Sequence, residues 1–334
     1  MVLIPGYGVE KEMCSLVKGY ISCPGGHVKK PLRQSCQRIE CPLCYMDWAN
    51  KASGRITDVL RGAQDAYRNV NANMCTDFQK AIKERKMVRR INHVVMSPEP
   101  GFIKKDECLN SIYKRFYLFL KHNHIFTGGF VIYHPYRIKS DVRKTLQNEI
   151  RKGRLSANYE DGGLWEMVHS DYLNLGSLQA YVYDSPHFHL LAFGGFPPSN
   201  VFHAKTGWVY KNLGQRDTAI RIDAKTGTII DEVKITAKYL LTHCAVMYNS
   251  EGRLYKTYRF YGVCSQTKLR VKKEFGVPVI RKVYESVLKC PVCGEALVHC
   301  EPIEEGYYPK KDAVGNDRLV RTKLVFRKYE VIEK

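Results

Sequence analysis

The sequence predicts an α+β fold extended by metal-binding segments, and three observations lead to this prediction. Short runs rich in β-branched residues and bounded by proline or glycine are typical of strands. Longer segments with apolar residues at every third or fourth position are typical of helices. CPxC sequences stand near both ends of the chain, which has no secretory signal, and this pattern indicates bound metal rather than disulfides. The 334 residues are enough to bury a sizeable core.

The expected elements follow one another along three segments. Residues 1–88 form an N-terminal segment that binds zinc and continues as helix over residues 45–90. The central domain, residues 89–263, opens with a strand that Pro98 and Pro100 end. After it we expect a helix over 108–123, a strand over 128–138, a helical insertion over 139–160, a strand over 178–196, a helix over 233–247 and a strand over 254–263. Residues 264–334 are a basic C-terminal segment.

The charge balance points to a polyanionic partner. The chain carries 53 Lys and Arg against 33 Asp and Glu, a net charge of +20. Such an excess favours nucleic acid, because phosphate neutralisation supplies much of the affinity, and the 22 Tyr and 13 Phe suit stacking on unpaired bases. We expect a cytoplasmic protein that does not associate with a membrane, since no apolar run approaches about 20 residues. A Gly-rich loop ending in GK[ST] is absent, so no nucleotide cofactor is expected.

Five metal-ligand candidates crowd the N-terminal segment. They are Cys23, His27, Cys36, Cys41 and Cys44, the last two within CPLC. A CPxC turn directs two thiolates into one tetrahedral zinc site, which a second pair of ligands must complete. We expect His27 and Cys36 to complete it, with Cys23 as the substitute; the alternative is a set of unpaired structural cysteines.

A second CPxC sequence, Cys290 to Cys293, lies near the C-terminus. It is half of a zinc site, for which His299 with Cys300, or Cys264, offers partners; the alternative is a turn with two surface thiols. Among the other cysteines, nothing in the sequence distinguishes Cys14, Cys75, Cys108 or Cys244 from ordinary core or helix residues.

Two histidines share one face of the strand SPHFHLLAF. Side chains at positions i and i+2 of a strand point the same way, so His187 and His189 project together. Taken alone, such a pair is more often coincidental than functional. His134 stands on the strand expected beside this one, and three imidazoles leave open positions on a metal for a substrate. Tyr239 and His243 share a face of the expected helix over 233–247.

The order of these motifs resembles the HUH endonucleases, and more narrowly the single-tyrosine rolling-circle replication initiators of archaeal plasmids and viruses. The similar segments are HVVMSPEP, FVIYHPYRIK, SPHFHLLAFG, TAKYLLTHCAV with YRFYGVCSQTKLR, and the cysteine-rich leader CPLCYMDWANKASGRI. The resemblance covers roughly residues 20 to 300. One departure is Thr242, because many relatives carry a lysine three residues after the tyrosine.

The resemblance implies a central antiparallel sheet of about five strands with helices on one face and the metal on the other. His134, His187 and His189 would bind Mn²⁺ or Mg²⁺, and Tyr239 would attack the scissile phosphate of single-stranded origin DNA. The products would be a 5′-phosphotyrosine and a 3′-hydroxyl that primes a host DNA polymerase, with a helicase as a further partner. The candidates for DNA binding are Arg137, Lys238 and His243. The zinc-bound extensions would recognise duplex DNA or the origin, or act as simple staples of small subdomains.

Three other classes share parts of this pattern. A conjugative relaxase or a single-tyrosine transposase would use the same histidines and tyrosine on other DNA sites. A zinc-containing DNA-binding protein without catalysis would not depend on them. A metal-dependent hydrolase that activates water would form no covalent species with DNA.

Overall fold

The computed structural model describes residues 2–10, 12, 14–23, 26–27, 29–68, 90–123, 128–154, 163–194, 197–217, 221–222, 229–265, 292–293, 298–300, 306–311 and 317–322. The chain divides into two compact units. The first comprises residues 1–5 and 49–280, and the second comprises residues 6–48 and 281–334. This division differs from the three consecutive segments expected from the sequence, because the N-terminal and C-terminal segments pair through strands and form one unit.

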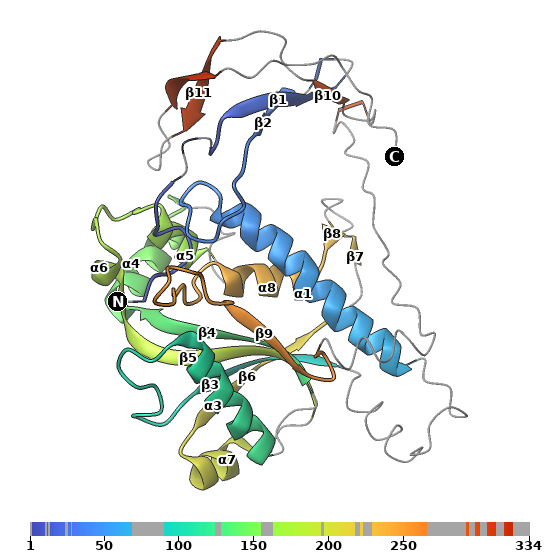
Figure 1. The fold of residues 1–334 in the computed structure, drawn as a ribbon, viewed down its shortest axis with the longest axis vertical. Coiled ribbons are helices and arrows are strands. Elements are labelled where there is room, and N and C mark those ends of the chain that lie inside the picture. The colour runs from blue at the N-terminus through green and yellow to red at the C-terminus, as the bar shows by residue number, and fades with distance from the viewer. Residues whose placement is uncertain are drawn as a thin grey trace. The chain divides into compact units, whose positions relative to one another are not determined.

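The first unit is built on a five-stranded antiparallel sheet, as expected (Figure 1). Its order is β6-β3-β5-β4-β9. The strands are β3 (Ile91–Ser97), β4 (Gly128–Ile138), β5 (Val182–Phe193), β6 (Val209–Arg216) and β9 (Tyr258–Gly262). Because β3 and β4 both pair antiparallel with β5, they run parallel to each other on either side of it. The central position of β5 places its side chains between two neighbouring strands.

One face of this sheet packs on α3 (Leu109–His122) and α7 (Ser199–Thr206). Alternate residues of β5, among them Phe188 and Leu190, point to this side. The rings of Phe116 and Phe188 stack with centroids 3.9 Å apart, and Trp208 lies beside both. These large aromatic side chains are fully buried, and they fix α3 on the sheet.

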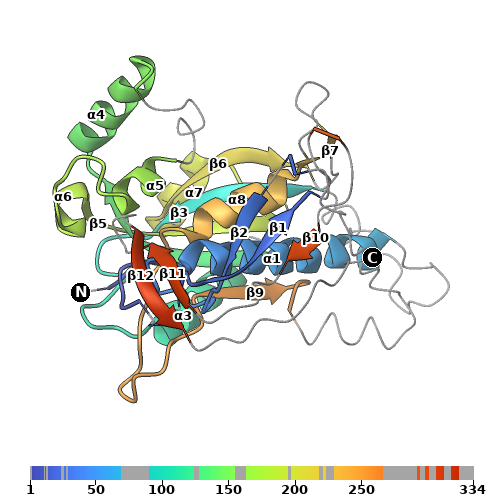
Figure 2. The ribbon, with the colours of Figure 1, turned by 90° about the horizontal axis from the view of Figure 1, so that it is seen from above.

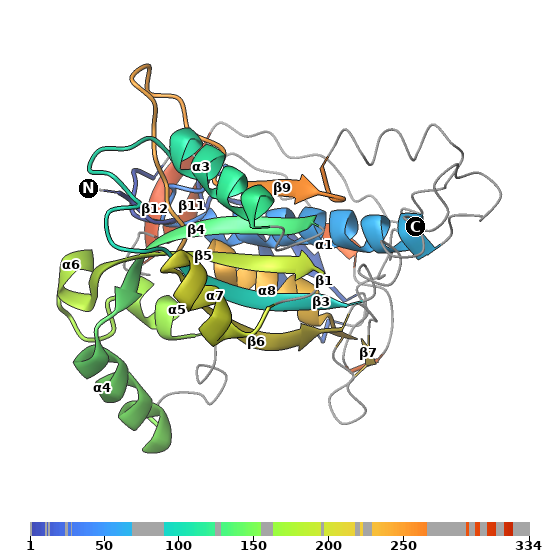
Figure 3. The ribbon, with the colours of Figure 1, turned by 90° about the horizontal axis from the view of Figure 1, so that it is seen from below.

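The other face is covered by α8 (Glu232–Leu241) and α1 (Tyr45–Arg68), which lie behind the strands in Figure 3, while α3 and α7 lie in front. The expectation of helices on one face alone was therefore wrong. The apolar residues of α8, such as Val233 and Ala237, need a sheet surface to be buried on. The side chain of Asp231 accepts a hydrogen bond from the N–H of Lys234 at the start of α8. Its Oδ2 also forms an ion pair with Nη2 of Arg61 in α1, 3.0 Å away.

Several predicted boundaries shift in the structure. The predicted strand over 178–196 begins with the short helix α6 (Leu178–Tyr181), and the helix over 233–247 ends at Leu241. The strand β9 is shorter than predicted, β6 was not predicted, and residues 69–89 of the predicted N-terminal helix lie outside the described residues. The remaining elements of this unit are α4 (Ser140–Arg151), α5 (Leu164–His169), β7 (Arg221–Ile222) and β8 (Ile229–Ile230).

The second unit contains two small antiparallel sheets. The first has the order β10-β1-β2 and consists of β1 (Val17–Ser22), β2 (Lys29–Arg33) and β10 (Val298–Cys300). The second is the hairpin of β11 (Gly306–Lys311) and β12 (Asp317–Thr322), whose two strands lie side by side in Figure 2. Two segments that are almost the whole chain apart thus share one sheet.

None of the helices that the structure describes combines the length and apolar character needed to cross a membrane.

Candidate metal centres and catalytic site

Three histidines meet on the face of the sheet that α8 covers. His134 of β4 pairs directly with His187 of β5, and His189 follows on the same side of β5. One ring nitrogen of each histidine lies within 4.8 Å of those of the other two. The side chains are 0%, 4% and 7% exposed, respectively, so the sheet holds them in a nearly dry environment. The sequence prediction that these three residues come together is confirmed.

Hydrogen bonds hold two of these rings in orientations that suit a metal. The Nε2–H of His134 donates to the carbonyl of Leu240 in α8, at 2.9 Å, and the Nδ1–H of His187 donates to the carbonyl of Ser185, at 2.6 Å. Each bond leaves the other ring nitrogen with its lone pair. His134 Nδ1 is buried and has no hydrogen-bond partner among the residues that the structure describes. A buried acceptor without a partner costs free energy, which a bound cation would recover.

A fourth histidine, His93, was not predicted from the sequence and contacts His189. His93 of β3 places Nε2 at 2.9 Å from His189 Nδ1, and Arg216 Nη2 lies 3.4 Å from His93 Nδ1. Because a guanidinium only donates, Arg216 favours the shared proton on His93 Nε2. Ligation through His189 Nε2 requires that proton on His189 Nδ1. Metal binding therefore favours the shared proton on His189 Nδ1, whereas the Arg216 contact favours it on His93 Nε2.

These imidazoles are neutral at physiological pH. Burial lowers the pKa of His187 to about 4 and that of His93 to about 3, with Arg216 adding to the second shift. Burial and the neighbouring histidines hold the pKa values of His134 and His189 well below the ordinary value. Neutral imidazole is the form that binds metals, so the protein keeps the cluster ready for a cation.

Tyr239 lies on the same cavity as the histidines. A cavity of about 410 Å³ is lined by His187, His189 and Tyr239, together with three cationic side chains, Arg137, Arg143 and Lys211. The tyrosine projects from α8, is half-buried, and has its ring centroid 4.8 Å from that of His243. A tyrosine hydroxyl, two imidazoles and three cationic side chains therefore share one space.

The three candidates for DNA binding fall in different places. Arg137 lines the cavity and donates to Ser97 Oγ at 3.1 Å, so its guanidinium is held at the wall. Lys238 does not line this cavity. His243 is only 2% exposed and stacks on Trp165 at 4.5 Å, with its other side toward His134 at 4.1 Å. It also lines the cavity, between the rings of Trp165, His134 and Tyr239, so its assignment as a DNA-contacting residue stays a prediction.

Thr242, two residues before Cys244, has a structural role at the end of α8. It is buried, and its hydroxyl donates to the carbonyl of Tyr239 at 2.8 Å. Its N–H bonds the same carbonyl, at 3.1 Å. The end of α8 is thereby fixed immediately after the tyrosine.

The N-terminal cysteines form a four-thiol cluster, but not with the predicted fourth member. Cys36, Cys41 and Cys44 lie together with Cys14, which the sequence analysis took for an ordinary core residue. The N–H of Cys44 donates to the carbonyl of Cys41 at 3.2 Å, a turn that directs both CPLC thiols to one side. Sγ of Cys41 is 3.6 Å from Sγ of Cys14, close to the edge of about 3.8 Å expected for a tetrahedron with metal–sulfur bonds of about 2.3 Å.

The electrostatics of this cluster also fit a cation. Burial raises the pKa of the Cys44 thiol, and nearby Cys14 and Cys41 add to the increase. Burial likewise raises the pKa of Cys36. Several thiolates close together are stable only when a positive ion balances them.

The other two N-terminal candidates lie elsewhere in the second unit. Cys23 and His27 form a separate group with Cys293. This corrects the expectation that His27 or Cys23 completes the site of Cys36, Cys41 and Cys44. Cys290 lies outside the described residues, and Cys264 is buried in the first unit.

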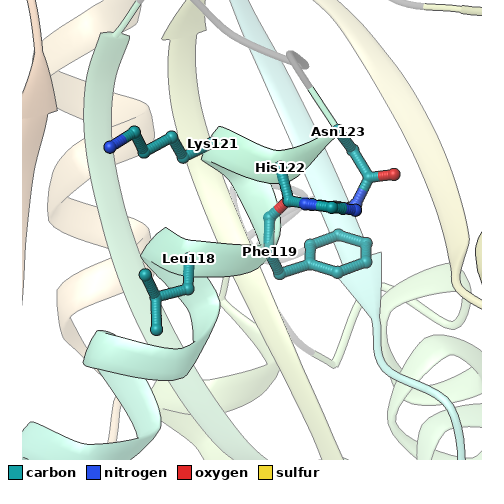
Figure 4. A pocket seen from close by; sticks show the side chains of 5 residues that line it. All are labelled: Leu118, Phe119, Lys121, His122 and Asn123. Atoms are coloured by element: carbon teal, nitrogen blue, oxygen red, sulfur yellow. Dashed lines mark hydrogen bonds between the residues drawn. The ribbon is translucent and has the colours of Figure 1, made fainter.

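A larger hollow of about 770 Å³ lies at the end of α3, where Figure 4 shows the side chains that line it. They are Leu118, Phe119, Lys121, His122 and Asn123. Its described lining brings only one imidazole and no acidic side chain or thiol. The hollow therefore lacks the set of ligands and nucleophile that the histidine cavity contains.

Comparisons with known proteins gave no match: no protein-family model, curated protein or solved structure is significantly similar to this chain.

Proposed function

We propose that this protein is a metal-dependent endonuclease and strand transferase of the HUH type, which nicks and rejoins single-stranded origin DNA to initiate rolling-circle replication. The observation that supports the proposal is the single cavity on which His187, His189 and Tyr239 meet. The third histidine, His134, has a ring nitrogen, Nδ1, for which the described part of the chain offers no hydrogen-bond partner. With a phosphodiester substrate, the neutral imidazoles would bind the metal that polarises the phosphate, and the adjacent tyrosine would attack the phosphorus.

His134, His187 and His189 would hold Mn²⁺ or Mg²⁺, and such an ion, when bound, polarises the scissile phosphate and lowers the free energy of charge in the transition state. Arg137, whose guanidinium Ser97 helps to hold at the cavity wall, would bind a non-bridging phosphate oxygen. Lys211 lies exposed on β6, where it would contact the backbone of the entering strand.

Tyr239 would be the nucleophile. Its hydroxyl would lose a proton as its oxygen bonds to phosphorus, while the bond to the 3′ oxygen breaks and that oxygen takes up one proton, so no proton is gained or lost overall. The tyrosine retains the phosphodiester as a 5′-phosphotyrosine, so rejoining needs no nucleotide cofactor. Because two fixed bonds from Thr242 hold the end of α8, the tyrosine keeps its position when the strand enters.

The free 3′-hydroxyl would prime a host DNA polymerase, with a helicase opening the duplex ahead of it. The net charge of +20 supports an extended DNA contact. The four-cysteine cluster, Cys14, Cys36, Cys41 and Cys44, would bind Zn²⁺ and hold the N-terminal segment that contributes to origin recognition.

The test is a denaturing gel of the protein with labelled single-stranded oligonucleotides that carry an origin hairpin, with and without Mn²⁺. We expect a covalent band on the 5′-phosphate side that requires metal, persists in Tyr248→Phe and disappears in Tyr239→Phe. Tyr248 is a suitable control because it stands on the segment after α8 and is 41% exposed. Cleavage without a covalent band would indicate water as the nucleophile, and binding without cleavage would indicate a zinc-containing DNA-binding protein.

Oligonucleotides with a conjugative transfer origin or with transposon ends, tested in parallel, separate the initiator from a relaxase or a transposase. We expect the replication-origin hairpin to be the preferred substrate.

A further inference from the structure

Two cysteines and a histidine from distant parts of the chain meet in the second unit. Sγ of Cys23 lies 3.3 Å from Sγ of Cys293, which is 270 residues further along the chain, and 3.6 Å from His27 Nδ1. The donor atoms of all three lie within 4.8 Å of one another. The distance of 3.3 Å between the two sulfur atoms is too long for a disulfide, whose bond is about 2.05 Å long.

The separations are those of ligands around one ion. Metal–sulfur bonds of about 2.3 Å and metal–nitrogen bonds of about 2.0–2.1 Å in a tetrahedron give sulfur–nitrogen edges of about 3.5 Å and sulfur–sulfur edges of about 3.8 Å. The Cys23–His27 distance matches the first value, and the Cys23–Cys293 distance is somewhat shorter than the second. Hydrogen bonding among three such groups is a weaker reason for their meeting, because thiols are poor donors and acceptors.

The local backbone explains how Cys23 and His27 converge. The N–H of Gly26 donates to the carbonyl of Cys23 at 2.9 Å, which closes a tight turn directly after β1. Gly26 has a backbone φ of +77°, a conformation that residues other than glycine rarely adopt. The turn directs His27 back toward Cys23.

An independent feature brings Cys293 to the same place. Strand β1 pairs antiparallel with β10, and Ser22, the last residue of β1, stands opposite Val298, the first residue of β10. Cys23 follows β1 and Cys293 precedes β10, so the pairing places both at one end of the sheet. The backbone pairing does not depend on the thiols, and the two observations agree.

We infer that Cys23, His27 and Cys293 bind one Zn²⁺ that joins the N-terminal hairpin to the C-terminal segment. This site is distinct from the four-cysteine cluster, and it does not depend on the nicking activity. The three donors leave the fourth position of a tetrahedral ion to a further ligand or to water. By binding side chains that are 270 residues apart in the sequence, the ion closes a long loop of the chain and keeps β10 paired with β1.

The test is the zinc content of the full-length protein in a background of His187→Ala and His189→Ala, which removes two of the three histidine donors. We expect two zinc ions per chain, one in Cys293→Ser and one in Cys44→Ser, and none when both are changed. Cys108→Ser is the control, because Cys108 precedes α3 and belongs to neither group of donors. Two ions in Cys293→Ser, or a zinc content that Cys293→Ser leaves equal to that of the parent protein, would overturn the inference.

Cobalt substitution keeps the result clear if a serine variant folds poorly. His27→Cys retains a donor at the same position, so we expect it to bind a full complement of Co²⁺ with stronger thiolate-to-metal charge-transfer absorption. An unchanged spectrum in His27→Cys would contradict the role of His27 as a ligand.

Discussion

Acidification should destabilise this protein through its buried neutral histidines, and His169 allows the effect to be measured away from the candidate ligands. Burial lowers the pKa of His169 to about 4, although its Nε2–H donates to the carbonyl of Thr242 at 2.8 Å. The unfolded chain has the ordinary pKa, so between these two values it binds more protons than the folded protein does. Stability is therefore fully present above pH of about 6.5 and decreases as the pH falls toward about 4.

The magnitude follows from the two pKa values. Each unit of difference between the pKa values of the folded and unfolded states is worth about 1.4 kcal/mol. Lowering the pH from 7 to 5 therefore removes about 2 kcal/mol of unfolding free energy through this one imidazole. This is an upper value, because the ring keeps some contact with water. His169→Gln retains a side-chain N–H donor and cannot take up the proton.

The assay is urea unfolding, followed by circular dichroism, of the parent protein and His169→Gln at pH 7 and pH 5. The difference between the two proteins cancels the contribution of thiol protonation at the cysteine clusters. We expect the pH-dependent loss to be smaller by about 1–2 kcal/mol in His169→Gln, and unchanged in His122→Gln, which replaces an exposed imidazole at the end of α3. Equal losses in the parent protein and His169→Gln would refute this reasoning.

Three further predictions concern single side chains. Arg216→Met removes the donor that competes for the His93 proton, because a thioether cannot donate, so Mn²⁺ affinity measured by calorimetry should rise several-fold; a weaker affinity would contradict the competition. Phe116→Ala removes a fully buried ring stacked on Phe188 and should cost about 3–5 kcal/mol in urea unfolding; a cost below about 1 kcal/mol would show that the core closes over the gap. Lys211→Ala should weaken single-strand binding and flatten its salt dependence, with the nicking rate at saturating DNA retained; an unchanged salt slope would exclude a phosphate contact.

The sequence predicted side-chain positions correctly where the regular alternation of side chains along a strand determines them. Alternation along a strand put His187 and His189 on one face, and two neighbouring strands with opposite directions placed His134 opposite the first of them. Tyr239 and His243 also meet as expected, with centroids 4.8 Å apart, although α8 ends before His243.

Sequence patterns failed where the partner comes from a distant segment without a motif. Cys14 stands in no CPxC sequence, so only the folded backbone shows that it joins Cys36. His93 lies in an otherwise apolar strand, and its role depends on the pairing of β3 with β5. That signal was available, since an imidazole on a strand next to the His187 strand is a candidate for the same face.

The strand β6 illustrates a different limit. Its residues, VYKNLGQR, are mostly exposed, and it lies at the edge of the sheet with a single partner strand. An edge strand that buries neither face shows no alternation of apolar and polar residues, so period-based prediction misses it. Lys211, which lines the histidine cavity, was missed for the same reason.

The most direct test of the central claim is to identify the residue that becomes linked to DNA. The Mn²⁺-dependent adduct with an origin oligonucleotide would be digested, and the nucleotide-bearing peptide sequenced by mass spectrometry. The account predicts phosphate on Tyr239, with Tyr248 unmodified in the same peptide, and loss of the adduct in His187→Ala. Linkage to Tyr248 or to a residue outside α8, or an adduct that forms without the histidines, would contradict it.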